Sequence, residues 1–88
     1  MLNWLEKGTA DSGLTHILAG HGKDFATAFG ITSPEDLSKL ILDTLGKHVP
    51  SDINKTLRIF SDVSWGEFTH DPGIVVATNG YIVTAFPI

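Results

Sequence analysis

Residues 73–87 constrain the fold more than any other part of this 88-residue chain. Two apolar runs, rich in β-branched residues, flank the dipeptide Asn79-Gly80. Asn-Gly between two such runs is the strongest short-range signal for a β-hairpin, because a type I′ turn needs positive φ angles at both central residues. The sequence therefore predicts that the chain closes with two antiparallel strands joined by a tight turn.

A two-residue turn would also set the register, pairing Thr78 with Tyr81 and Val75 with Thr84. In this register the hydroxyl of Thr84 shares one face with four apolar residues, Val75, Ala77, Ile82 and Phe86. The opposite face is apolar too. We therefore expect one face to pack on helices, and the other to be a cleft or a surface for a partner.

The first half of the chain is predicted to be helical. Apolar spacing of i, i+3, i+4 and i+7 indicates a short helix over residues 14–20. Gly20 and Gly22 are expected to end or kink it, and a second short helix is predicted over residues 23–29.

A third helix is predicted over residues 34–46 by the clearest boundary signals in the chain. Ser33 is a favoured N-cap residue, and Pro34 suits the first helical position. Acidic residues follow in the first turn, where they complement the helix dipole. Gly46 and Lys47 then close the helix.

The second half of the chain reads as a meander of four short strands, over residues 56–61, 67–70, 73–78 and 81–86. The whole sequence thus predicts a single α+β domain over residues 1–88, with N-terminal helices (about 14–46) packed on a four-stranded antiparallel β-sheet (about 56–87). With no cysteine, stability must come from the core or from a partner. The chain would suit a C-terminal module of a longer protein.

Charge and hydropathy exclude some classes of function. Six basic and ten acidic residues give a formal net charge of −4. An acidic chain is a poor candidate for a broad electrostatic grip on nucleic acid, although a small basic site or a basic partner remains compatible. No apolar run has the length of a membrane span, and the N-terminus lacks a signal-peptide pattern.

The four histidines do not have the spacing of a metal site. His16 and His21 are five residues apart, whereas a helical zinc pair is spaced i, i+4, and the chain has neither cysteine nor an HExxH motif. His48 and His70 fall in connector or turn segments and are interpreted as surface residues. Neither a nucleophile-elbow motif nor a phosphate-binding glycine loop is present. We therefore expect no metal and no cofactor.

Cleavage of RNA without a metal needs only a few side chains, because the ribose 2′-OH is the nucleophile. An acid, a base and a cation for the phosphorane suffice. His16, His21 and Lys23 lie within eight residues of one another, Arg58 is the only arginine, and Thr84 adds a hydroxyl on the last strand.

These segments carry a family resemblance. The motif His16-Ile-Leu with His21-Gly-Lys-Asp-Phe, the strand with Arg58, and the final Asn-Gly-Tyr-Ile-Val-Thr-Ala-Phe-Pro resemble toxin domains of the Barnase–EndoU–colicin–RelE superfamily. Within it, the chain is most similar to C-terminal toxins of contact-dependent growth inhibition systems. Members are typically metal-independent RNases, several of them specific for tRNA, and each is neutralised by a cognate immunity protein.

The resemblance implies a role for each candidate residue. His16 and His21 would be the acid/base groups, Lys23 and Arg58 would bind phosphate, and Thr84 would position the scissile group. The domain would be delivered as part of a larger secreted or cell-surface protein and would cleave tRNA in the cytoplasm of the target cell. Its acidic charge leaves open a requirement for a host cofactor protein.

Ordinary structural roles compete with each of these assignments. His21 lies on the apolar stripe of its helix, Lys23 suits a solvated surface, and Arg58 suits an ion pair with a nearby carboxylate. His16 could be solvent-exposed without a role, and Thr84 could simply be a good strand former. The chain as a whole could also be a non-catalytic protein-binding module that uses the exposed sheet face, or a DNA-cleaving toxin with a divalent metal. Convergence of His16, Arg58 and Thr84 on one cleft is the geometric requirement of the nuclease hypothesis.

Overall fold

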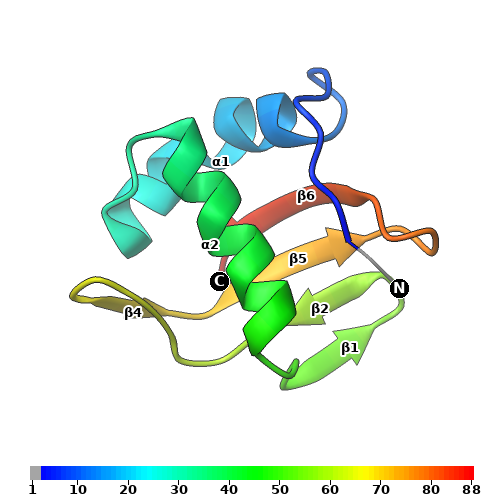
Figure 1. The fold of residues 1–88 in the computed structure, drawn as a ribbon. Coiled ribbons are helices and arrows are strands. Elements are labelled where there is room, and N and C mark those ends of the chain that lie inside the picture. Colours follow the sequence, from blue (N-terminus) through cyan, green and yellow to red (C-terminus); the bar gives the residue numbers. More distant parts are fainter. Residues whose placement is uncertain (1–2) are drawn as a thin grey trace.

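Two helices cover one face of a four-stranded antiparallel sheet, so the predicted α+β architecture with N-terminal helices is confirmed (Figure 1). The structure is a computed structural model that describes residues 3–88, so Met1 and Leu2, the first residues of the predicted domain, lie outside the described range. Figure 1 shows α2 crossing the sheet and α1 lying above β6.

The first helix, α1 (Leu14–Phe29), is continuous, and the predicted break at Gly20 and Gly22 is wrong. Glycine in a helix interior costs about 1 kcal/mol relative to alanine. Tertiary packing outweighs this cost, because one stripe of α1 is fully buried against the rest of the protein, through Ile17, Phe25 and Phe29. Gly30, in the left-handed conformation at φ 68°, ends the helix.

The second helix, α2 (Pro34–Lys47), confirms the prediction made from its boundary signals. The Ser33 hydroxyl accepts a hydrogen bond from the Asp36 N–H at 3.1 Å, which satisfies one unpaired donor of the first turn. The buried stripe of α2 faces the sheet, through Leu37, Leu40, Ile41 and Thr44.

The strands are partly as predicted. The main sheet has the order β1-β2-β5-β6 and contains β1 (Asp52–Asn54), β2 (Leu57–Ile59), β5 (Pro72–Val76) and β6 (Ile82–Pro87). A separate hairpin between β2 and β5 contains β3 (Val63–Trp65) and β4 (Phe68–His70). The predicted simple meander is therefore wrong. A tight turn at Gly66, with φ 59°, pairs β4 with the unpredicted β3, and the unpredicted β1 completes the sheet.

The turn of the final hairpin differs from the predicted type I′ turn. Only Gly80 has a positive φ in it, at 98°. Its N–H donates to the Ala77 carbonyl at 2.9 Å, and the Ala77 N–H donates to the Tyr81 carbonyl at 2.8 Å. These bonds enclose a three-residue loop, so the predicted pair of Thr78 with Tyr81 is wrong.

A second irregularity restores the predicted register further along the hairpin. Val76 pairs with Ile82, but Val75 pairs with Thr84, so Val83 is an extra residue at a β-bulge. The predicted pair of Val75 with Thr84 is thus confirmed. Ile82 is fully buried on the helix-covered face. It therefore does not share a face with Thr84, and the prediction that the two residues share a face is wrong.

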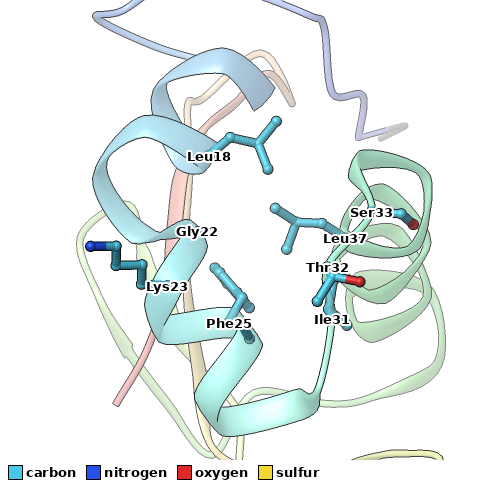
Figure 2. A pocket seen from close by; sticks show the side chains of 9 residues that line it. Leu18, Gly22, Lys23, Phe25, Ile31, Thr32, Ser33 and Leu37 are labelled. Atoms are coloured by element: carbon cyan, nitrogen blue, oxygen red, sulfur yellow. The ribbon is translucent and has the colours of Figure 1, made fainter.

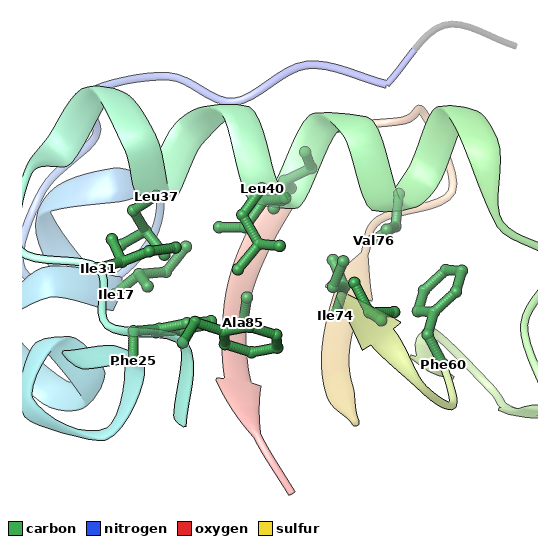
Figure 3. Close-up of a cluster of buried hydrophobic side chains, with 13 residues drawn as sticks. Ile17, Phe25, Ile31, Leu37, Leu40, Phe60, Ile74, Val76 and Ala85 are labelled. Carbon is green, nitrogen blue, oxygen red and sulfur yellow. The ribbon is translucent and has the colours of Figure 1, made fainter. Parts of the chain in front are cut away.

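The core lies between the helices and the sheet (Figure 3). The outer edge of β6 is protected by the N-terminal segment: the Trp4 N–H donates to the Gly80 carbonyl at 3.1 Å, and the Ile82 N–H donates to the Trp4 carbonyl at 2.9 Å. Further along, the Gly13 N–H donates to the Val83 carbonyl at 2.9 Å, which fixes the start of α1 beside β6.

Candidate active site

The candidate active site lies on the part of α1 that packs alongside β6. Its N-terminal end is tied to β6 through Gly13, and two turns later the His21 ring packs on Phe86 of the same strand, with ring centroids 5.7 Å apart. Side chains on this flank of α1 therefore lie beside the sheet edge.

His16 is oriented by the loop that precedes α1. Its Nδ1 lies 2.8 Å from the Ala10 carbonyl oxygen. A carbonyl oxygen can only accept, so Nδ1 carries the proton and donates this bond. In the neutral ring Nε2 is then the free acceptor. His16, which faces away from the apolar stripe of α1, is thus held with one nitrogen available to a ligand.

His21 is oriented from within α1. Its Nδ1 lies 3.5 Å from Oδ2 of Asp24, one turn further along the helix, and its side chain is 32% exposed. Contact with Phe86 limits the ring from the β6 side. His21 therefore combines the half-buried position expected from the apolar stripe with a partly accessible imidazole.

The rings of His16 and His21, called the histidine pair below, lie side by side, with centroids 6.3 Å apart and planes at 78°. Gly20 separates the two positions on the helix, and nothing lies within 4 Å of the place its Cβ would occupy. Rings at this separation are in edge contact, so one phosphodiester can contact both imidazoles from outside the pair but not from between the rings.

Lys23 lies on the same side of α1 as His16, seven residues or two turns further along. This spacing is about 10 Å along the helix axis. Figure 2 shows the Lys23 side chain directed away from the pocket between α1 and α2, and the residue is exposed. Its ammonium group can therefore bind an anion near the histidine pair.

The pocket in Figure 2 borders this site, because Lys23 is one of its lining residues. It has a volume of about 280 Å³ and lies between α1 and the start of α2. Its walls are mainly apolar, from Leu18, Phe25, Ile31 and Leu37, and neither histidine of the pair lines it.

Arg58 is not brought together with the histidine pair or with Thr84. It pairs with Ile74, which pairs with Ala85, and both of these residues are fully buried on the helix-covered face. Thr84 pairs with Val75 on the opposite face. Adjacent strands lie about 4.8 Å apart, so β2 is about 10 Å from β6. The convergence of His16, Arg58 and Thr84 that the sequence hypothesis required is therefore not met at Arg58.

Thr84 lies on β6, but its hydroxyl does not face a ligand. Its Oγ1 is fully buried and has no hydrogen-bond partner among residues 3–88. A buried hydroxyl without a partner costs roughly 1–3 kcal/mol. In this conformation the hydroxyl cannot touch a substrate.

Three further residues belong to this region that sequence reasoning did not assign to it: Asp24, Phe86 and His70. The i, i+3 spacing of His21 and Asp24 was a usable signal for the first. The other two depend on tertiary packing. His70, expected at the surface, is half-buried and packs edge-on against Phe29, with ring centroids 5.9 Å apart.

No family model matches the chain, and no curated protein is significantly similar to it in sequence. Within residues 3–88, no three His, Asp or Glu side chains gather closely enough to hold a metal ion. Neither helix of that range is long and apolar enough to cross a membrane.

Proposed function

We propose that this protein is a metal-independent endoribonuclease toxin domain, and that its main substrate is tRNA. The observation that carries the proposal is the histidine pair: two imidazoles 6.3 Å apart, one oriented by the Ala10 carbonyl and the other by the Asp24 carboxylate. Acid–base catalysis on a phosphodiester needs two such groups, one for each reacting oxygen.

The reaction follows from the free nitrogens of the pair. Nε2 of His16 accepts the proton of the ribose 2′-OH, and this oxygen attacks the phosphorus to form a 2′,3′-cyclic phosphate. The bond from phosphorus to the 5′-oxygen breaks, and His21 donates a proton to that leaving oxygen. A base and an acid in these positions each contribute about 10²- to 10⁴-fold in rate.

Lys23 supplies the cation in this proposal. Its exposed ammonium group lies two helical turns from His16, on the same side of α1, where it can bind the phosphate oxygens. Arg58 has no part in the proposed chemistry, because β2 lies two strands away from β6, along which α1 packs. Thr84 makes no contact with the substrate in this proposal, because its Oγ1 is fully buried.

The test is cleavage of total RNA in the presence of EDTA by the wild type and by His16→Ala and His21→Ala. Each variant should lose about 100-fold or more of the activity. His48→Ala is the matched control, because His48 is exposed at the end of α2 and should retain wild-type cleavage. No cleavage by the wild type, or equal cleavage by all four proteins, would contradict the proposal.

The biological setting is proposed from the sequence resemblance. The domain is delivered to a target cell as part of a larger secreted or cell-surface protein, acts in the cytoplasm, and is neutralised by a cognate immunity protein. The net charge of −4 supports a need for a host cofactor protein that holds the RNA. Cleavage of purified tRNA with and without cell extract tests this need: equal rates would show that no cofactor is required.

A second candidate function, a protein-binding module, is favoured by the sheet face opposite the helices. This face carries half-buried apolar side chains, from Leu57, Ile59, Val75 and Phe86. A Cβ at Gly73 would lie 3.0 Å from the Phe86 ring and 3.2 Å from Ile88, so both side chains lie over the strand here. If Val75→Lys abolishes toxicity in cells while His16→Ala does not, the binding function holds and the nuclease function fails.

A further inference from the structure

A second pocket continues the candidate active site toward the far end of α1. It has a volume of about 430 Å³ and is called the His70 pocket here; its lining residues are Asp24, Thr27, Ala28, His70, Pro87 and Ile88. Small-molecule sites usually have volumes of about 300–1,000 Å³. Asp24 joins the two regions, because it lines the pocket and its Oδ2 lies 3.5 Å from Nδ1 of His21.

The lining of the His70 pocket disfavours phosphate. It contains a carboxylate, and neither lysine nor arginine is among its described lining residues. A nucleotide whose phosphate contacts the histidine pair would therefore place a neutral group in this pocket. The imidazole of His70, held edge-on against the buried Phe29 ring, offers a flat surface on which a base can stack, and Pro87 and Ile88 add apolar walls.

The polar groups of the pocket select among the bases. An ionised carboxylate only accepts hydrogen bonds and has about four lone-pair sites, so its contact with His21 leaves Asp24 free to accept others. Guanine presents two adjacent donors, N1–H and the N2 amino group, which match one carboxylate. Adenine and cytosine place an acceptor beside their amino group, and uracil places its single donor between two acceptors. The Thr27 hydroxyl, one turn beyond Asp24, can donate to the O6 atom of guanine.

We infer that the His70 pocket binds the guanine base of the nucleotide whose phosphate contacts the histidine pair. This inference rests on the proposed ribonuclease function, which it deepens by naming the base beside the scissile bond. Asp24 then has two roles: it orients His21 and reads the Watson–Crick edge of guanine.

Two measurements test the inference. The first is an NMR titration of ¹⁵N-labelled protein with the 3′-monophosphates of the four nucleosides. Guanosine 3′-monophosphate should shift the amides of Asp24, Thr27 and His70 and should bind about tenfold or more tightly than the other three. The second is the cleavage rate, as kcat/KM, of RNA oligonucleotides that differ only in the base beside the cut site.

Variants separate recognition from general damage. Asp24→Asn and Thr27→Val should reduce the preference for guanine, measured as a ratio of kcat/KM values, by about tenfold for the first and less for the second. Asp43→Asn on α2 is the matched control and should keep the ratio of the wild type. A purely structural role for Asp24 would lower cleavage of all four substrates equally.

The outcomes distinguish the two proposals. Cleavage without a base preference, or equal binding of the four monophosphates, would overturn the guanine pocket and leave the ribonuclease function intact. Absence of cleavage together with selective binding of guanosine 3′-monophosphate would overturn the ribonuclease function and leave the pocket.

Discussion

The side of α1 that lies beside β6 brings its candidate residues together, whereas the sheet keeps its candidate residues apart. On α1, two histidines that are five residues apart in sequence remain neighbours in space, with ring centroids 6.3 Å apart. On the sheet, the order of the strands and the alternation of side chains decide which groups meet, and they place Arg58 and Thr84 on opposite faces. Proximity in sequence therefore predicts a site on a helix far better than it does across a sheet.

The largest expected effect tests whether α1 is packed more tightly than the β1 side of the sheet. Phe25 is 1% exposed within the core, so Phe25→Ala should lower the free energy of unfolding by about 3–5 kcal/mol. Ile53 on β1 is 61% exposed, and Ile53→Ala should change it by less than about 0.5 kcal/mol. Urea denaturation followed by circular dichroism measures both. Similar losses in the two variants would show that the β1 side is as tightly packed as the α1 side.

The next effect compares two exposed lysines, one on each side of the molecule. Lys23→Met should lower cleavage of RNA about tenfold, because a charge-assisted contact with phosphate contributes about 1.5–3 kcal/mol. Lys55→Met, in the turn between β1 and β2, should leave cleavage unchanged. Cleavage rates in EDTA measure the difference, and an equal loss in both variants would indicate only a general effect of charge.

The smallest expected effect compares two buried threonine hydroxyls. Thr84→Val removes an Oγ1 without a partner and should raise the free energy of unfolding by about 1 kcal/mol, with cleavage retained. The Thr44 hydroxyl donates to the Leu40 carbonyl at 2.7 Å, so Thr44→Val should lower it by about 0.5–1 kcal/mol. Loss of cleavage in Thr84→Val, without loss of stability, would restore Thr84 to the active site.

Local signals predicted much of the fold. Ser33 and Pro34 located the start of α2, and the apolar runs around Asn79 located the last two strands. The two loop residues of the β1–β2 turn, Lys55 and Thr56, are not usual turn residues, yet Lys55 adopts φ 58°, and β1 was missed for this reason. The glycines of α1 suggested a break because the burial that holds the helix together is a tertiary effect.

The site was predictable to the extent that it lies on one helix. His16, His21 and Lys23 share α1, and their separations follow from helical geometry. The face of Arg58 depends on which strand β2 pairs with, and no local pattern specifies that partner. The contact of His21 with Phe86 likewise needs α1 to lie along β6, which only the packed structure shows.

The central claim is that cleavage depends on the histidine pair of α1 and not on the arginine of the sheet. Its most direct measurement is the rate of RNA cleavage in EDTA by Arg58→Met beside His16→Ala, with the folding of each variant checked by thermal unfolding. The account predicts a rate within about twofold of the wild type for Arg58→Met and a loss of about 100-fold for His16→Ala. A folded Arg58→Met variant without activity, or a fully active His16→Ala variant, would contradict it.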